Sequence, residues 1–195
     1  MPAYSQPMPV RAATRRDVLA AAETLFRERG YTRTSVHDLA EAAGVAVKSI
    51  YNAFGSKRGV LAALAEGIPG YALDPRIRTE CDAASVVKLV AGRLAAEHER
   101  NADLRTTVRE AAAGDVQLAA LEQDRREGRL AAYCELAREL KRRDALAEGV
   151  AIDEAALTVG VLADAQTYRL LRERGWTQAR YERWLERGLR TQLLR

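Results

Sequence analysis

The sequence predicts an all-α protein of about nine helices, in which a three-helix helix-turn-helix module precedes a larger helical bundle. Two observations support this fold class. Alanine, leucine, arginine and glutamate dominate the 195 residues, and all four favour helices over strands. Apolar residues also recur at three- and four-residue spacing through most of the chain, and glycine and proline rarely interrupt these stretches.

The first predicted helix runs from about Arg15 to Arg29, and its apolar side chains fall on one face. Gly30 ends it with a left-handed residue. Ser35, followed by Asp38 three positions later, is typical of a capping box and starts a second, short helix. Gly44 ends that helix in the same way.

A third helix follows almost at once, with Ile50 and Phe54 one turn apart on its inner face. Ser56 can cap a fourth helix that begins at Lys57. A turn-rich stretch with Gly67, Pro69 and Gly70 then separates the two halves of the chain. Five further helices are expected beyond it, at about 82–99, 103–113, 116–143, 154–174 and 178–194.

These patterns divide the chain into four predicted parts. Residues 1–10 form a disordered arm, because they hold three prolines and no charged side chain. Residues 11–58 form the helix-turn-helix domain, 59–75 a connecting helix and linker, and 76–195 a larger domain.

The positive charge is concentrated in the first third of the sequence. Residues 11–58 hold nine basic and five acidic side chains, whereas the remainder is neutral, so the whole net charge of +4 lies in this window. A polyanion would therefore dock there. From charge alone, an ordinary solvated helix surface is the alternative interpretation.

Several classes of site are not predicted. The two cysteines, Cys81 and Cys134, and the two histidines, His37 and His98, lack the spacing of metal ligands or of a disulfide framework, so we expect no metal and no cofactor. No run of about eighteen apolar residues could span a membrane, and the uncharged N-terminus does not resemble a signal peptide. We therefore expect a cytoplasmic protein without a membrane partner.

The third helix presents polar side chains on its outer face, where a recognition helix would meet the major groove of double-stranded DNA. Lys48 and Asn52 suit guanine and adenine edges, and Ser49 suits a base or a phosphate. Tyr51 and Lys57 suit phosphates, Lys57 because it lies at a helix N-terminus. The complete set of candidate DNA-binding residues is Arg33, Thr34, Ser35, Lys48, Ser49, Tyr51, Asn52 and Lys57. A compact helical subdomain with a solvated face is the alternative.

The run from Leu25 to Leu64, LFRERGYTRTSVHDLAEAAGVAVKSIYNAFGSKRGVLAAL, resembles the DNA-binding region of TetR-type transcriptional regulators. The resemblance implies a homodimer that binds a palindromic operator, most often as a repressor released by a small molecule. It also implies that Tyr51 and Lys57 contact phosphates. Two positions depart from the pattern, because Ala46 replaces a capping Ser or Thr and Ala53 replaces a His.

The last two predicted helices carry more apolar surface than one subunit needs. Residues 154–171 are apolar around almost the whole helix, and the final helix has an apolar stripe. We expect a two-fold, four-helix dimer interface built from these helices. Its candidate residues are Gly160, Tyr181, Trp184, Leu185, Gly188 and Leu189. Packing of the last helix within its own subunit is the alternative.

A small, largely apolar effector is expected to bind among the helices of the C-terminal domain. Gly92 and Gly128 lie inside predicted helices at a propensity cost of roughly 1 kcal/mol each, which suits a pocket wall. Polar groups that could point into such a pocket are Arg93, Arg125, Tyr133 and Gln166. Surface positions or hydrogen bonds between helices are the alternative for each of them.

The sequence therefore predicts a DNA-binding transcriptional regulator and no enzyme. It shows no nucleophile, metal cluster or phosphate loop that would support a helical enzyme. An architectural DNA-binding protein without an effector is the other alternative. The long neutral C-terminal region, which exceeds what DNA binding and dimerisation need, argues against it.

Overall fold

The computed structural model describes residues 12–69, 72–79 and 82–195, so the predicted N-terminal arm lies outside the described residues. The described residues form helices and no strand, which confirms the all-α prediction. The chain divides into two compact units. Unit 1 comprises residues up to Ile68 together with Thr107–Ala119, and unit 2 comprises Pro69–Thr106 and Ala120–Arg195.

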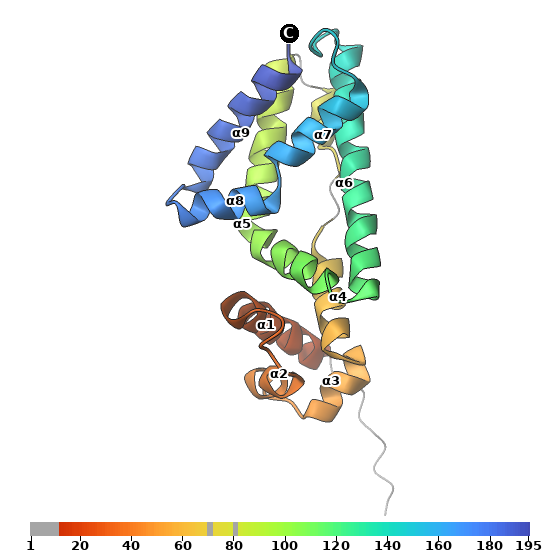
Figure 1. Cartoon of the computed structure of the whole chain (residues 1–195), viewed down its shortest axis with the longest axis vertical. Helices are drawn as coiled ribbons and strands as arrows, with labels where there is room; N and C mark the ends of the chain where they lie inside the picture. The colour runs from red at the N-terminus through yellow and green to blue at the C-terminus, as the bar shows by residue number, and fades with distance from the viewer. Residues whose placement is uncertain (1–11, 70–71, 80–81) are drawn as a thin grey trace, which may run out of the picture. The chain divides into compact units, whose positions relative to one another are not determined.

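Four short helices make up most of unit 1 (Figure 1). They are α1 (Ala12–Arg29), α2 (Val36–Ala43), α3 (Val47–Phe54) and α4 (Lys57–Gly67). Their apolar faces form a common core that includes Val18, Phe26, Leu39, Ile50 and Leu61. Because α4 belongs to this unit, the compact N-terminal body extends beyond the predicted domain end at residue 58.

The caps that the sequence predicts in unit 1 are present. Ser35 caps α2, and the reciprocal bond from its own backbone N–H to the Asp38 side chain completes a capping box. Gly44 ends α2 with a φ of 65°, in the left-handed region that favours glycine. The side chain of Ser56 accepts a hydrogen bond from the backbone N–H of Gly59 at the start of α4.

Unit 2 contains a short 3₁₀ helix, η1 (Pro75–Arg78), and the greater part of two long helices, α5 (Ala83–Ala112) and α6 (Val116–Arg142). Both long helices continue into unit 1 at their shared turn. Three shorter helices complete unit 2, namely α7 (Ile152–Leu162), α8 (Ala165–Glu173) and α9 (Gln178–Leu193).

Two helix boundaries differ from the prediction. The expected helices at 82–99 and 103–113 are one continuous helix, α5, in which the Asn101 side chain donates a hydrogen bond to Glu97 one turn earlier. The expected helix at 154–174 is instead broken after Leu162. Asp164 there accepts a hydrogen bond from the backbone N–H of Gln166 and starts α8.

None of the described helices combines the length and the apolar character that crossing a lipid bilayer requires.

Candidate nucleic-acid interface

Helix α3 turns one apolar and one polar face in opposite directions. Ile50 is fully buried and anchors the helix in unit 1. Lys48, Tyr51 and Asn52 are exposed, and Tyr51 keeps 51% of its surface accessible although it is a large aromatic residue. The spacing of these three positions places them on one helix face. Ser49 is only half-buried and lies beside them in sequence.

The two ends of α3 differ in how they are held. Ala46 occupies its N-cap and makes no side-chain hydrogen bond, so the departure noted in the sequence leaves this end uncapped. At the other end the chain passes directly into α4. A Cβ atom at Gly59 would lie 1.9 Å from the carbonyl oxygen of Phe54, so only glycine allows this close approach. Gly59 could not be recognised from the sequence, because its role depends on this contact between two helices.

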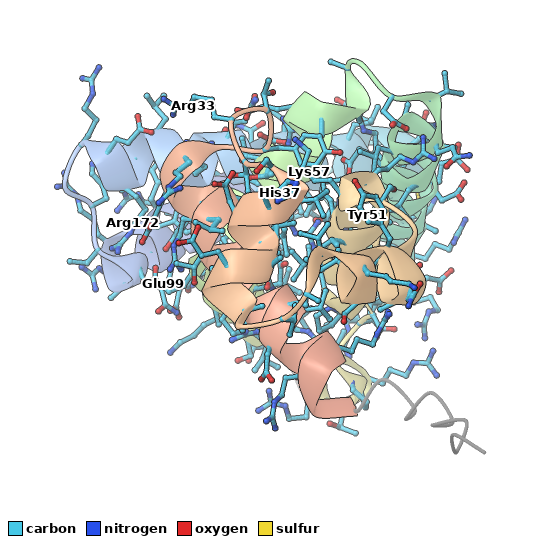
Figure 2. All side chains as sticks on the ribbon, turned by 90° about the horizontal axis from the view of Figure 1, so that it is seen from below. Arg33, His37, Tyr51, Lys57, Glu99 and Arg172 are labelled. Atoms are coloured by element: carbon cyan, nitrogen blue, oxygen red, sulfur yellow. The ribbon has the colours of Figure 1, made fainter. Side chains whose placement is uncertain are left out.

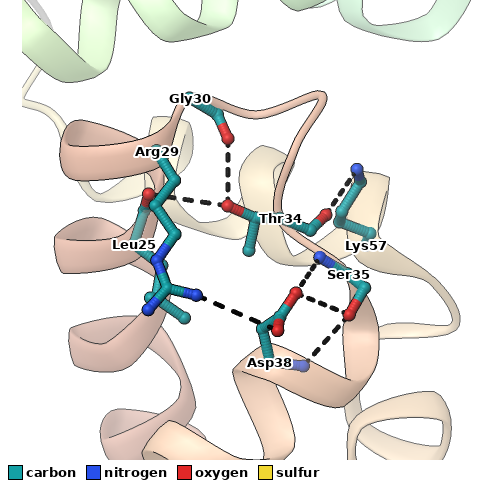
Figure 3. A network of polar contacts seen from close by, with 7 residues as sticks. All are labelled: Leu25, Arg29, Gly30, Thr34, Ser35, Asp38 and Lys57. Carbon is teal, nitrogen blue, oxygen red and sulfur yellow. Dashed lines mark hydrogen bonds and ion pairs between the residues drawn. The ribbon is translucent and has the colours of Figure 1, made fainter.

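A polar network holds the segment between α1 and α2 (Figure 3). The Thr34 hydroxyl donates to the carbonyl oxygen of Gly30 at 2.9 Å, and its side chain is buried. The prediction that Thr34 is a DNA-binding residue is therefore corrected, because its hydroxyl is bonded inside the unit. The Ser35 hydroxyl donates to Asp38 Oδ2 at 2.6 Å within the capping box.

Asp38 is the acceptor at the centre of this network. Hydrogen bonds from the Ser35 hydroxyl and backbone N–H lower the pKa of Asp38, and Arg29, whose Nη1 lies 4.0 Å from Oδ1, adds to the effect. Arg33 is exposed and donates from Nε to the carbonyl oxygen of Arg29 at 2.7 Å. Arg33 lies in the turn after α1, and this bond holds its guanidinium beside the last residue of that helix.

Lys57 bridges α4 and the segment that precedes α2. Its Nζ donates to the carbonyl oxygens of Tyr31 at 2.8 Å and of Thr34 at 2.7 Å. The same ammonium lies 4.3 Å from the centroid of the Tyr31 ring. Partial burial lowers the pKa of Lys57. The sequence placed Lys57 at a helix N-terminus, but it gave no indication of these two backbone acceptors.

Figure 2 views the molecule from below, with Arg33, His37, Tyr51 and Lys57 of unit 1 labelled. The N-terminus of α2, where His37 is exposed, offers backbone N–H groups of the kind that bind phosphate. Arg15 of α1 also supports the end of α3, because its guanidinium lies 4.6 Å from the centroid of the Phe54 ring.

One ion pair joins α4 to the turn between α5 and α6, within unit 1. Arg58 Nη1 lies 3.2 Å from Asp115 Oδ2. Asp115 also accepts hydrogen bonds from the backbone N–H groups of Gln117 and Leu118, and these bonds together with Arg58 lower its pKa. The pair is 57 residues apart in sequence, so no local pattern could have predicted it.

Residues 18–64 match the family model described as bacterial regulatory proteins, tetR family. The N-terminal region of the chain is therefore similar to the tetR family of bacterial regulatory proteins. The matched residues contain all of α2 and α3 and most of α1 and α4, which confirms the resemblance that the sequence suggested. A family of regulatory proteins also agrees with the prediction that the chain is not an enzyme.

Solved structures of transcriptional regulators share the fold over nearly the whole chain. A transcriptional regulator from Saccharomonospora viridis in complex with choline is 18% identical, with a TM-score of 0.74 over 95% of this chain and all of that one. SmeT, a repressor of a Stenotrophomonas maltophilia multidrug efflux pump, is 20% identical, with a TM-score of 0.74 over 96% and 93% of the two chains. The fatty acid degradation regulator FadR from Bacillus halodurans is also 20% identical, with a TM-score of 0.71 over 96% of each chain. No curated protein sequence matches this chain.

The four predicted effector residues are not brought together in unit 2. Tyr133 is buried, and Arg125 is half-buried and shares the charged neighbours Arg105, Arg129 and Glu97 with it. Arg93 is instead an exposed residue that lies 3.9 Å from Asp74, and Gln166 is exposed in the first turn of α8. Two of the four therefore face a common interior region.

The predicted dimer residues also fall into two groups, one buried in the core of unit 2 and one exposed. Tyr181, Leu185 and Leu189 are fully buried within their own unit, so they belong to its core and leave no surface for a partner. Gly160 faces the Tyr133 ring and not the outside. Trp184 and Gly188, in contrast, line an open groove of about 810 Å³ along α7 and α9, together with Asp153, Glu154, Leu157, Thr158, Val161, Leu162, Arg187, Thr191 and Gln192.

Proposed function

We propose that this TetR-type regulator is a repressor that binds a palindromic operator as a homodimer and is released by a small-molecule effector. The observation that carries the proposal is the outer face of α3, where Lys48, Tyr51 and Asn52 are exposed while Ile50 holds the helix in the core. A helix anchored in this way can lie in the major groove without disturbing the fold.

Each polar group on this face has a proposed task. Lys48 and Asn52, one turn apart, would reach base edges, and Ser49 would bind a base or a phosphate. Tyr51, Arg33 and the α2 N-terminus after Ser35 would bind the phosphate backbone. The Lys57 ammonium has three N–H groups, of which two donate to backbone carbonyls. The third would donate to a phosphate.

The test is fluorescence anisotropy with an operator obtained by selection from random DNA, beside a scrambled duplex of equal length. Lys48→Ala and Asn52→Ala are each expected to weaken operator binding by about 1–3 kcal/mol per half-site and to change scrambled binding much less. Equal losses on both duplexes would refute base reading by α3. A selected site without two-fold symmetry would refute the palindrome.

The homodimer proposal is supported by the exposed apolar residues of the α7–α9 groove. Leu157 and Val161 retain 56% and 69% of their surface, although both are aliphatic. Helix α7 of a second subunit could cover them. Asp153 and Glu154 of one subunit could then form ion pairs with Arg187 of the other across a two-fold axis. Sedimentation should show a dimer at micromolar concentration, and Val161→Glu should dissociate it. Leu170→Glu, which alters another exposed residue on α8, is the matched control and should remain dimeric.

Effector release is supported by the size of unit 2 and by the fold shared with the S. viridis regulator that was crystallised with choline. A ligand that weakens DNA binding must bind the DNA-free protein more tightly than the DNA-bound protein. The coupling free energy between the two sites would be roughly 1–3 kcal/mol. A ligand screen read by melting temperature and by operator affinity tests this directly. A ligand that raises the melting temperature and leaves operator affinity unchanged would contradict release.

A further inference from the structure

An open cavity of unit 2 lies along α6 and shares no residue with the DNA-binding face or with the α7–α9 groove. Its volume is about 520 Å³, within the range of roughly 300–1,000 Å³ that is usual for small-molecule sites. One wall is α6, and the other is the segment of residues 72–78, which includes η1. We call it the α6 cavity.

The α6 wall is the outer face of that helix. Leu136 and Leu140 are fully buried and point into the core of unit 2. Ala131, Glu135 and Arg138, at four- and three-residue spacing, are exposed and line the cavity. The cavity is therefore separate from the packed interior of the bundle.

Gly128 is the residue of this wall that most needs an explanation. Glycine is unfavourable in the interior of a helix, and Gly128 lies in the middle of the 27-residue α6. Close packing does not account for it, because a Cβ atom placed there would meet no neighbouring atom within 4 Å. Gly128 instead lines the α6 cavity, as expected of a pocket wall. Beside it, Ala131 and Ala132 add no atom beyond Cβ, so this wall is low enough for a flat apolar group to lie against the helix.

The charged side chains that line the cavity are not balanced. Glu135 and Arg138 form an ion pair, in which Arg138 Nη1 lies 2.5 Å from Glu135 Oε1. Arg78 lines the cavity from the other wall and is exposed. Within the described part of the chain, no hydrogen bond or ion pair engages its guanidinium group. The lining thus holds two guanidinium groups and one carboxylate, and Arg78 is available to a negatively charged ligand.

We propose that the α6 cavity binds an aromatic carboxylate as the effector, with the carboxylate on Arg78 and the ring on the wall around Gly128. A guanidinium group matches a carboxylate through two parallel hydrogen bonds, and its plane also stacks on aromatic rings. This inference rests on the proposed effector response, and it replaces the expected largely apolar ligand with an anionic one.

Both walls of the cavity continue along the chain into unit 1. Residues 72–78 follow α4, which ends in unit 1, and α6 enters unit 1 at Ala119–Ala120. A ligand that holds these two segments together therefore acts on two of the connections between the units. This gives the ligand a route by which its binding can alter DNA binding.

Cys134 provides a local reporter, because it lines the cavity and is half-buried. The probes are 2-naphthoate, 2-naphthamide and 2-naphthylmethylamine, which share one ring system and carry a negative, a neutral and a positive group. Alkylation of Cys134 by neutral iodoacetamide is followed in the full-length protein by mass spectrometry of the peptide that contains it. Near-saturating 2-naphthoate should slow alkylation roughly tenfold, since labelling requires the ligand-free state, and the other two probes should slow it less than about twofold. Equal effects of all three, no effect of 2-naphthoate, or a preference for the amine would overturn the assignment.

Two pairs of variants test the two walls, each compared with its own rate without a probe. Arg78→Met should abolish the preference for 2-naphthoate. Arg126→Met, which changes an exposed arginine of α6 outside the cavity lining, should behave like the wild type. Gly128→Leu should fill the cavity and remove the protection, whereas Gly128→Ala leaves most of the space and should retain it.

Both Gly128 variants replace a glycine inside a helix, so neither should melt below the wild type without a probe, and misfolding can be recognised. Normal protection in a folded Gly128→Leu or Arg78→Met variant would refute the site.

Operator affinity separates this inference from the proposed function. 2-Naphthoate should weaken operator binding roughly fivefold or more in the wild type and not in Arg78→Met. If it protects Cys134 and leaves operator affinity unchanged, the effector role assigned to this cavity is wrong, whereas repression by operator binding stands. If no duplex is bound even without a probe, the proposed function itself fails.

Discussion

Lys57 has two possible roles that one set of measurements can separate. Its ammonium makes two charge-assisted hydrogen bonds to backbone carbonyls and a contact with the Tyr31 ring. Hydrogen bonds to a charged group contribute about 1.5–3 kcal/mol each, and the ring contact adds about 0.5–1 kcal/mol. Two effects make the net loss smaller than this sum. In the variant, water can bond to the carbonyl groups of Tyr31 and Thr34, and the cost of burying the Lys57 charge disappears. Lys57→Met should therefore lower the free energy of unfolding by about 2–4 kcal/mol.

A phosphate contact would give a different signal. Loss of one phosphate contact per subunit flattens the plot of log affinity against log salt by roughly two units in a dimer. Lys57→Arg keeps the charge but cannot place a compact ammonium between two carbonyls, so it should preserve the slope and lose stability. Lys48→Met, which changes an exposed lysine on α3, should alter stability by less than about 0.5 kcal/mol.

Urea unfolding and operator anisotropy over a salt series check both roles in the same four proteins. A Lys57→Met variant as stable as the wild type would refute the structural role derived from the two hydrogen bonds. If stability falls and the salt slope is unchanged, Lys57 holds the domain together without touching DNA. If both change, the ammonium serves the fold and the phosphate.

Three further outcomes are expected. Gly59→Ala should destabilise unit 1 by about 1–3 kcal/mol or more in urea unfolding, because its Cβ would clash with the Phe54 carbonyl; a neutral result would contradict the close approach. Burial lowers the pKa of His98 below its usual 6.5 in the folded protein, so the unfolded chain binds a proton at a higher pH than the folded chain does. The free energy of unfolding should therefore fall as the pH drops from about 6.5 toward the pKa of the folded protein. His98→Gln should remove that loss in unfolding measured from pH 8 to 5. A double-mutant cycle on Arg58 and Asp115 should give a coupling free energy of about 0.2–1 kcal/mol, because the Arg58 side chain is 42% exposed. A coupling of zero would show that the ion pair does not contribute to stability.

The features that the sequence predicted correctly are those with a local cause. The Ser35 capping box, the left-handed Gly44 and the Ser56 cap each depend on residues within four positions, and all three are present. The outer face of α3 follows from the position of Ile50 and the helical period. These signals lie close together in the first third of the chain, so its organisation could be predicted almost completely.

Errors arose where distant parts of the chain decide the role of a residue. Tyr181 and Leu185 lie on the apolar stripe that was expected to reach a partner, but neighbouring helices of their own unit cover them. An apolar stripe shows that a face is buried and does not show what buries it. Asp164 was overlooked because it lies within an apolar run, although a single aspartate can stop one helix and start the next.

The division of the chain indicates how a ligand could affect DNA binding. The boundary between the units is crossed at three places, after Ile68, at Thr106–Thr107 inside α5, and at Ala119–Ala120 inside α6. The last two crossings are continuous helix, which transmits displacement better than an irregular segment does. Both helices end at the turn that holds Asp115, and Asp115 pairs with Arg58 in the first turn of α4. If an effector binds unit 2 as proposed, a change in the spacing of α5 and α6 would therefore act on unit 1 through that turn. For this reason the Arg58–Asp115 coupling should differ between the ligand-free and ligand-bound protein if this route operates.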